Sequence, residues 1–222
     1  MPHEVRQPER KSPRAWLFDL DNTLHDASPH IFPHINRSMR QYIERHLGLS
    51  EEDATRLRQD YWVRYGATLL GLMRHHGTDP HHFLRETHDF PDLAKLVVFS
   101  HHVRHMLRRL PGRKIIFSNA PHHYVEAILK ITGMERSFDA VYAVENLRFR
   151  PKPMLEGFRS LLAAERLNPR NCIMIEDTLA NLISAKRLGM RTVWVSAGSR
   201  QPAFVDLKIN RIEQLAKRIG RL

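Results

Sequence analysis

The sequence predicts an α/β protein in which a doubly wound parallel sheet carries an all-helical insertion after its first strand. After residue 110, short apolar runs alternate with segments of helical length, a pattern typical of a parallel sheet covered on both faces. Between the first apolar run and this region, apolar residues recur at helical spacing without any strand pattern. The 222 residues are 42% hydrophobic, which is enough for a packed core.

The first predicted strand covers residues 15–18, four apolar residues that end at Asp19. The helical region follows, and Ser50 with Asp53 three positions later is typical of a helix start. Breaks are expected near residues 66, 77–80 and 90–92, where glycine or proline interrupts the pattern.

The remainder of the chain alternates between strands and helices. Strands are expected at 114–117, 140–144, 172–175 and 192–195, with a weaker one at 204–209, and helices at 125–133, 153–167, 178–188 and 212–219. We therefore divide the chain into a flexible tail (1–13), a core (14–24 and 108–222) and a helical cap (25–107).

Composition narrows the function classes. Lys and Arg number 35 against 24 Asp and Glu, a net charge of +11 that attracts anions such as nucleotides and phosphate esters. We find no Lys/Arg block and no zinc-finger spacing, so dedicated nucleic-acid binding is not favoured. The single cysteine, Cys172, lies in an apolar run and excludes a disulfide within the chain, which favours a cytoplasmic location. No apolar stretch approaches the ~18 residues of a membrane span.

Polar residues follow four of the predicted strands. These sets are Asp19-Leu20-Asp21-Asn22-Thr23, Ser118-Asn119, Lys152 between two prolines, and Glu176-Asp177. Ligands of open parallel sheets bind at the carboxyl ends of the strands, so we expect the four sets to meet. Taken singly, each set has an ordinary interpretation as a turn, a helix cap or a solvated loop.

The Asp19-x-Asp21-x-Thr23-Leu24 pattern resembles motif one of the haloacid dehalogenase superfamily of phosphatases, and the other three sets follow the order of its remaining motifs. The resemblance covers residues 15 to about 196. Within the superfamily, the chain most resembles the pyrimidine 5'-nucleotidase branch. This likeness rests on residues 16–25, 65–72, 110–114, 176–182 and 185–195. Dehalogenases lack an acid at the position of Asp21, so Asp21 indicates phosphate esters. Many members of this branch have Asp where Glu176 stands.

The chemistry fits these residue types. A carboxylate facing a phosphate dianion at ~4 Å experiences roughly 8 kcal/mol of repulsion at an effective dielectric of about 20, which Mg²⁺ and a lysine can offset. The resemblance implies Asp19 as nucleophile and Asp21 as general acid and base, with Lys152 neutralising charge. It further implies phosphate contacts from Ser118, Asn119 and Lys152, and Mg²⁺ ligands from Asp19, Asp21 (its backbone carbonyl), Asp177 and Glu176.

Substrate choice is expected to lie in the cap and to favour nucleoside monophosphates, pyrimidine ones first. The candidate substrate contacts are His25, Arg64, Tyr65, Thr68 and His88; Tyr65 could stack on a base or simply pack between helices. Three alternatives stay open: another small-molecule phosphatase of the phosphoglycolate type, a phosphomutase, or a catalytically silent basic binding module. The chain is expected to be a monomer or a homodimer.

Fifteen histidines suggest a second metal hypothesis. Several form adjacent pairs, which face different ways on a helix and chelate poorly. His101 and His105 are four apart and could chelate, but no acid follows in the zinc-protease order. A structural zinc site is therefore not favoured from the sequence.

Overall fold

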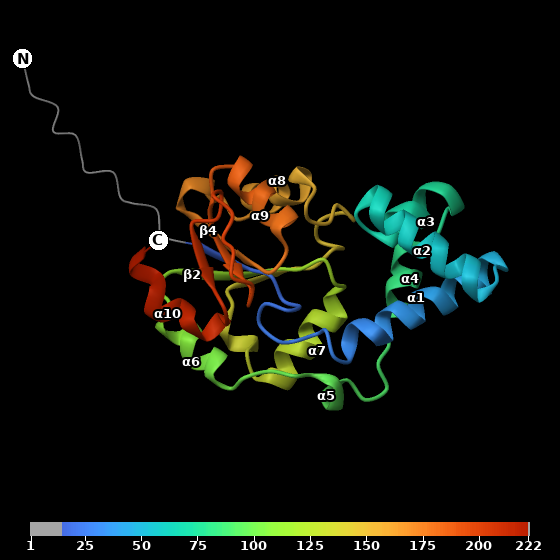
Figure 1. Ribbon diagram of the computed structural model, residues 1–222, viewed down its shortest axis with the longest axis horizontal. Coiled ribbons are helices and arrows are strands. Elements are labelled where there is room, and N and C mark those ends of the chain that lie inside the picture. The colour runs from blue at the N-terminus through green and yellow to red at the C-terminus, as the bar shows by residue number, and fades with distance from the viewer. Residues whose placement is uncertain (1–14, 222) are drawn as a thin grey trace, which may run out of the picture.

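A computed structural model describes residues 15–221, and the tail predicted over residues 1–13 lies outside them. Its centre is a six-stranded parallel sheet in the order β3-β2-β1-β4-β5-β6 (Figure 1). The strands are β1 (Ala15–Phe18), β2 (Arg113–Phe117), β3 (Ala140–Tyr142), β4 (Cys172–Glu176), β5 (Arg191–Val195) and β6 (Leu207–Ile209). The predicted α/β fold class is confirmed.

Six helices separate β1 from β2, three connect the later strands, and the last follows β6. The first six are α1 (Ile31–Leu47), α2 (Glu51–Tyr65), α3 (Thr68–His76), α4 (Pro80–Thr87), α5 (Leu93–Leu96) and α6 (His102–Arg109). The others are α7 (His122–Thr132), α8 (Leu155–Ala164), α9 (Leu179–Arg187) and α10 (Leu215–Arg218). The single helix predicted over 212–219 is instead α10 between two short 3₁₀ turns.

The sheet is covered on both faces because alternate residues of each strand point to opposite sides. Trp16 and Phe18 of β1 belong to one apolar cluster with residues of α6, α7 and α10. Ala15 and Leu17 belong to a second cluster with residues of α8 and α9. All four side chains are fully buried, so β1 forms the middle of a three-layer core, with α8 and α9 above and α6, α7 and α10 below in Figure 1.

The inserted helices α1 to α4 have an apolar cluster of their own. It contains Tyr42, Ala54, Tyr61, Leu72 and Phe83, with one residue or more from each of the four helices. The helices stand to one side of the sheet in Figure 1. α6 differs, because its buried residues join the cluster around β1 and it packs against α10. The cap boundary expected at residue 107 therefore falls inside a helix that packs with the sheet.

The cysteine and the helix lengths can now be compared with the expectations from composition. Cys172 is buried in β4, and burial raises the pKa of its thiol to about 11, so it is an unreactive apolar residue at neutral pH. Among residues 15–221, none of the helices combines the length and the apolar character needed to cross a membrane.

Candidate active site

The site begins at the carboxyl end of β1. Phe18 pairs in parallel register with Ile116 of β2 and Ile175 of β4, so the ends of three strands lie side by side. The backbone N–H of Asp19 continues the ladder by donating to the Ile175 carbonyl at 3.0 Å. Its side chain, 10% exposed, therefore projects from the sheet edge at the point where the strand order reverses.

Lys152 connects the acidic groups. Its Nζ donates to Asp19 Oδ1 at 2.6 Å and to Glu176 Oε2 at 2.7 Å, and the side chain is almost fully buried. Asn119, which follows β2, holds the backbone of Lys152 on both sides. Its Oδ1 accepts from the Lys152 N–H at 2.8 Å and its Nδ2 donates to the Lys152 carbonyl at 2.9 Å. The ammonium is thus fixed between two carboxylates by residues far away in the chain.

Burial controls the charges of this trio. Burial, with the nearby Glu176, raises the pKa of Asp19 to about 7 even though Lys152 opposes the shift. Burial likewise raises the pKa of Glu176 to about 7 against the attraction of Lys152. For Lys152, burial alone would lower the pKa, but Asp19 and Glu176 together raise it above its ordinary value. One ammonium therefore does not fully compensate the carboxylates around it.

Glu176 is fully engaged by neighbouring donors. Besides Lys152, its Oε2 accepts from Asn181 Nδ2 at 3.0 Å. Its Oε1 accepts from the backbone N–H groups of Asp177 and Thr178, each at 3.2 Å. Such an arrangement orients the carboxylate toward the lysine, so positioning Lys152 is the role that these contacts support directly.

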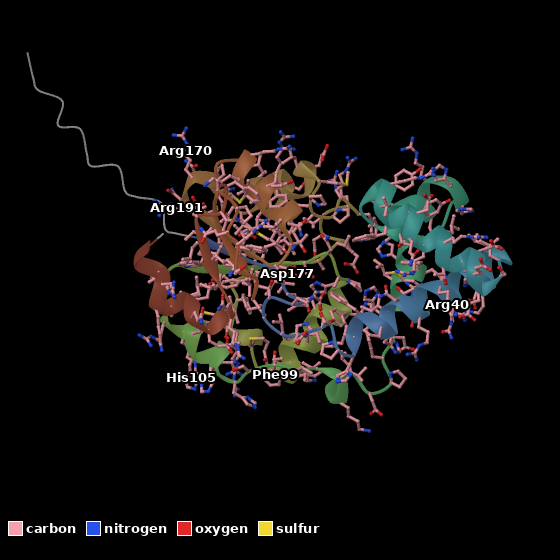
Figure 2. The ribbon with its side chains drawn as sticks, in the orientation of Figure 1. Arg40, Phe99, His105, Arg170, Asp177 and Arg191 are labelled. Carbon is pink, nitrogen blue, oxygen red and sulfur yellow. The ribbon has the colours of Figure 1, made fainter. Side chains whose placement is uncertain are left out.

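The acidic residues fit a divalent cation. Asp19, Glu176 and Asp177 each place a carboxylate oxygen within 4.8 Å of those of the other two. Hard oxygen donors are the ligands that Mg²⁺ prefers, and the Lys152 ammonium pairs with only Asp19 and Glu176 of these three residues. Figure 2 shows Asp177 between the sheet and the inserted helices, whereas Arg191, at the start of β5, lies at the opposite edge.

Asp21 is held from two sides. Tyr124 of α7 donates its hydroxyl to Asp21 Oδ1 at 2.6 Å, and His25 Nε2 lies 3.0 Å from the same oxygen. Both hydrogen bonds fall on Oδ1, which leaves Oδ2 of this largely buried side chain able to exchange a proton. Tyr124 was not predicted, because a tyrosine in an amphipathic helix gives no sequence signal of a catalytic contact.

The remaining polar residues shape the loops around Asp19. Thr23 donates its hydroxyl to Asp19 Oδ2 at 3.1 Å. Asn22 adopts a left-handed backbone with φ of 59°, and its side chain accepts from the Ala27 N–H at 3.0 Å, which closes the loop. Ser118 is buried after β2, and its Oγ accepts from the Ala120 N–H.

A hollow of about 760 Å³ opens beside these loops. Its lining includes Asn22, Thr23, Asp177 and segments that follow β5 and β6. The hollow gives solvent and small molecules a route to the side of the acidic cluster on which Asp177 lies.

The predicted substrate contacts divide into two groups. His25 contacts Asp21, and the buried His88 ring lies 5.8 Å from the Tyr124 ring. The other three use their polar atoms within the inserted helices: Arg64 pairs with Asp60, Tyr65 with His75, and Thr68 donates to the Arg58 carbonyl. The structure thus does not bring Arg64, Tyr65 and Thr68 to the site through their polar groups.

The turn between α2 and α3 nevertheless approaches the site. Gly66 has a φ of 79°, which favours glycine, and a Cβ at this position would lie 3.9 Å from Cδ of Pro153. Because Pro153 follows Lys152 directly, the backbone of this turn lies close to the segment that carries Lys152.

Comparison with known proteins agrees with this geometry. The family model for haloacid dehalogenase-like hydrolases matches residues 13–189. The 5'-nucleotidase of Pseudomonas aeruginosa is 30% identical over 193 residues, which cover 82% of each chain. A HAD phosphatase from Thermococcus onnurineus has the same fold, with a TM-score of 0.66 at 23% identity over 93% of this chain and 98% of that one.

Other curated relatives are longer than the part that matches. Phosphate metabolism protein 8 of Saccharomyces cerevisiae is 24% identical over 208 residues, 84% of this chain but 64% of the yeast protein. Hexitol phosphatase B of Escherichia coli K12 is 30% identical over 102 residues, 44% of this chain and 46% of its own length. This chain therefore matches less than two thirds of the length of each of these two relatives.

Proposed function

This chain is an enzyme of the haloacid dehalogenase-like hydrolase family, and on that premise we propose that it is a Mg²⁺-dependent phosphatase of small phosphate monoesters with a preference for nucleoside 5'-monophosphates. One observation carries the proposal. Lys152 Nζ lies within hydrogen-bonding distance of Asp19 and Glu176 at the edge of the sheet where Asp21 and Asp177 also lie.

Asp19 acts as the nucleophile in this proposal. One of its carboxylate oxygens forms a bond to phosphorus while the bond from phosphorus to the ester oxygen breaks, which leaves an aspartyl-phosphate. Lys152 neutralises charge on Asp19 before attack and on the phosphoryl oxygens afterwards. Ser118 would contact the phosphoryl oxygens through its hydroxyl, and Asn119 through its backbone amide, because both polar atoms of the Asn119 side chain are bound to Lys152.

Asp21 moves the protons. Its Oδ2 donates a proton to the leaving alkoxide and then removes one from the water that hydrolyses the aspartyl-phosphate. Tyr124 and His25 hold Oδ1 and so fix the orientation of the carboxylate during both steps. Asp19, Asp177 and the Asp21 backbone carbonyl would hold Mg²⁺, while Glu176, which already accepts from four donors, would direct Lys152 beside the ion. When bound, Mg²⁺ supplies the positive charge that lets an anionic nucleophile approach a phosphate ester.

The proposed preference for nucleotides rests on the similarity of this chain to a relative that is named for that activity. The Pseudomonas aeruginosa relative, which is named a 5'-nucleotidase, matches this chain over most of both lengths. The excess of basic residues, 35 against 24 acidic, also favours an anionic substrate. The proposal further includes a cytoplasmic location, consistent with one buried, unpaired cysteine, and a chain that acts as a monomer or a homodimer.

A phosphate-release screen tests the proposal. Purified protein is assayed against UMP, CMP, purine monophosphates, sugar phosphates and phosphoglycolate, with Mg²⁺ or with EDTA. We expect Mg²⁺-dependent release that is fastest from a pyrimidine monophosphate and absent in Asp19→Asn and Asp21→Asn. Rapid release from a sugar phosphate but none from UMP or CMP would reject the nucleotide preference, and full turnover by Asp19→Asn would reject the mechanism. Product analysis separates hydrolysis from a phosphomutase, which transfers the group instead of releasing it.

A further inference from the structure

A second cluster of metal-binding side chains lies in the inserted helices. His46 near the end of α1 and His82 and Glu86 on α4 each place one potential ligand atom within 4.8 Å of those of the other two. His82 Nε2 lies 3.0 Å from Glu86 Oε1, and His46 Nε2 lies 3.8 Å from Glu86 Oε2. Two imidazoles and one carboxylate from two packed helices thus converge on one point.

We propose that these three residues bind a divalent transition metal ion, with Zn²⁺ as the expected occupant. Imidazole with one carboxylate is a donor set that suits Zn²⁺, whereas the all-oxygen cluster around Asp19 suits Mg²⁺. Four-coordinate Zn²⁺ with ligands at ~2 Å has ligand atoms roughly 3.3 Å apart. The 3.0 Å between His82 Nε2 and Glu86 Oε1 is close to that spacing. His46 Nε2 lies 3.8 Å from the other oxygen, Oε2, so the His46 side chain must rotate toward Oε1 for all three ligands to share one ion.

The surroundings of the cluster orient its ligands. The Tyr42 hydroxyl lies 3.0 Å from His82 Nδ1, so that nitrogen can donate to the tyrosine and leave Nε2 free to bind the ion. Arg45 donates to Glu86 Oε2 at 2.6 Å and leaves Oε1 directed toward His82. Outer partners of this kind fix the tautomer and the direction of metal ligands.

The site is open on one side. The side chains of His46, His82 and Glu86 are 40%, 39% and 30% exposed, so an ion can enter from solvent and water can supply a fourth ligand. The ion would join the end of α1 to α4, two helices that already pack together, and would stabilise the inserted helices rather than take part in hydrolysis.

Zinc binding to the untagged, metal-stripped full chain tests the site, by equilibrium dialysis in excess Mg²⁺ so that the acidic cluster is occupied. We expect wild type to bind one Zn²⁺ per chain under these conditions. His82→Ala and Glu86→Gln should weaken binding by at least about tenfold, and Tyr42→Phe should weaken it by about tenfold because His82 loses its outer partner. Glu86→Gln keeps the size of the side chain and guards against a loss caused by misfolding.

His105→Ala is the matched control, because His101 and His105 are also exposed and four residues apart, but among residues 15–221 they form no cluster with a carboxylate. It should bind Zn²⁺ as wild type does, and every variant should retain the far-UV circular dichroism of wild type. The proposal is overturned if wild type binds no Zn²⁺, if His105→Ala loses as much affinity as His82→Ala, or if His82→Ala and Glu86→Gln bind as wild type does. The last outcome would also be seen if Zn²⁺ entered only the acidic cluster.

Discussion

Replacing Asp19 by asparagine should stabilise the metal-free protein at pH 8 while it abolishes hydrolysis. Burial raises the pKa of Asp19 from 3.8 to about 7. A carboxyl whose folded-state pKa lies above its unfolded value makes the folded state less stable as pH rises through that interval. The change of about three units, at 1.36 kcal/mol each, sets an upper limit of about 4 kcal/mol.

The net gain should be smaller than this limit. Lys152 donates to both Asp19 and Glu176. Removing the negative charge of Asp19 therefore leaves the buried Lys152 ammonium with one carboxylate partner, and this costs part of the gain. An asparagine oxygen can still accept from Lys152 Nζ, which keeps that donor satisfied. We therefore expect a gain of about 2 kcal/mol at pH 8, shrinking toward pH 5, where much of the wild-type Asp19 is protonated in the folded state.

Urea denaturation in EDTA at pH 8 and pH 5 measures this difference. Asp89→Asn serves as the control, because Asp89 is exposed and its neutralisation should change the free energy of unfolding little. Added Mg²⁺ should stabilise wild type more than Asp19→Asn, since the ion binds the folded state through that carboxylate. An Asp19→Asn protein that is no more stable than wild type at pH 8, or that gains equally at pH 5, would refute the reasoning.

Three further predictions concern neighbouring groups. Tyr124→Phe removes the hydrogen bond to Asp21, worth about 1.5–3 kcal/mol, and should lower kcat about tenfold at constant KM; an unchanged kcat in steady-state assays would show that His25 alone suffices. Burial lowers the pKa of His88 to about 4, so the protein should lose up to about 3 kcal/mol of stability as pH falls from 6.5 to 4, and His88→Asn should flatten that slope in urea denaturation. Glu176→Gln should lower kcat through Lys152 yet change the apparent Mg²⁺ affinity less than Asp177→Asn does in rate titrations; equal losses of affinity would make Glu176 a direct ligand.

The sequence was sufficient for the fold class because it depends on local patterns. Four apolar residues before Asp19 indicate a buried strand, and the alternation after residue 110 indicates a parallel sheet covered by helices. The order of the polar strand ends also predicted that Asp19 and Lys152 meet, and they lie 2.6 Å apart across 133 positions of the chain. That prediction needed only the rule that parallel strands finish at the same edge.

The inserted helices show where such reasoning ends. Arg64, Tyr65 and Thr68 carried suitable groups for a substrate, but their directions depend on how α2 and α3 pack. Helical periodicity says which residues share a face, and it does not say which neighbour that face meets. The approach of Gly66 to Pro153 is likewise a property of the packed structure.

By itself, then, the sequence determined the strands, the helices and the chemical types at the strand ends, because these follow from neighbouring residues along the chain. Only the tertiary structure decided that Tyr124 holds Asp21, that Glu176 directs Lys152, and that His46 meets His82 and Glu86. Each of these contacts joins elements distant in the chain, and their distances depend on how helices and strands pack against one another rather than on any local pattern.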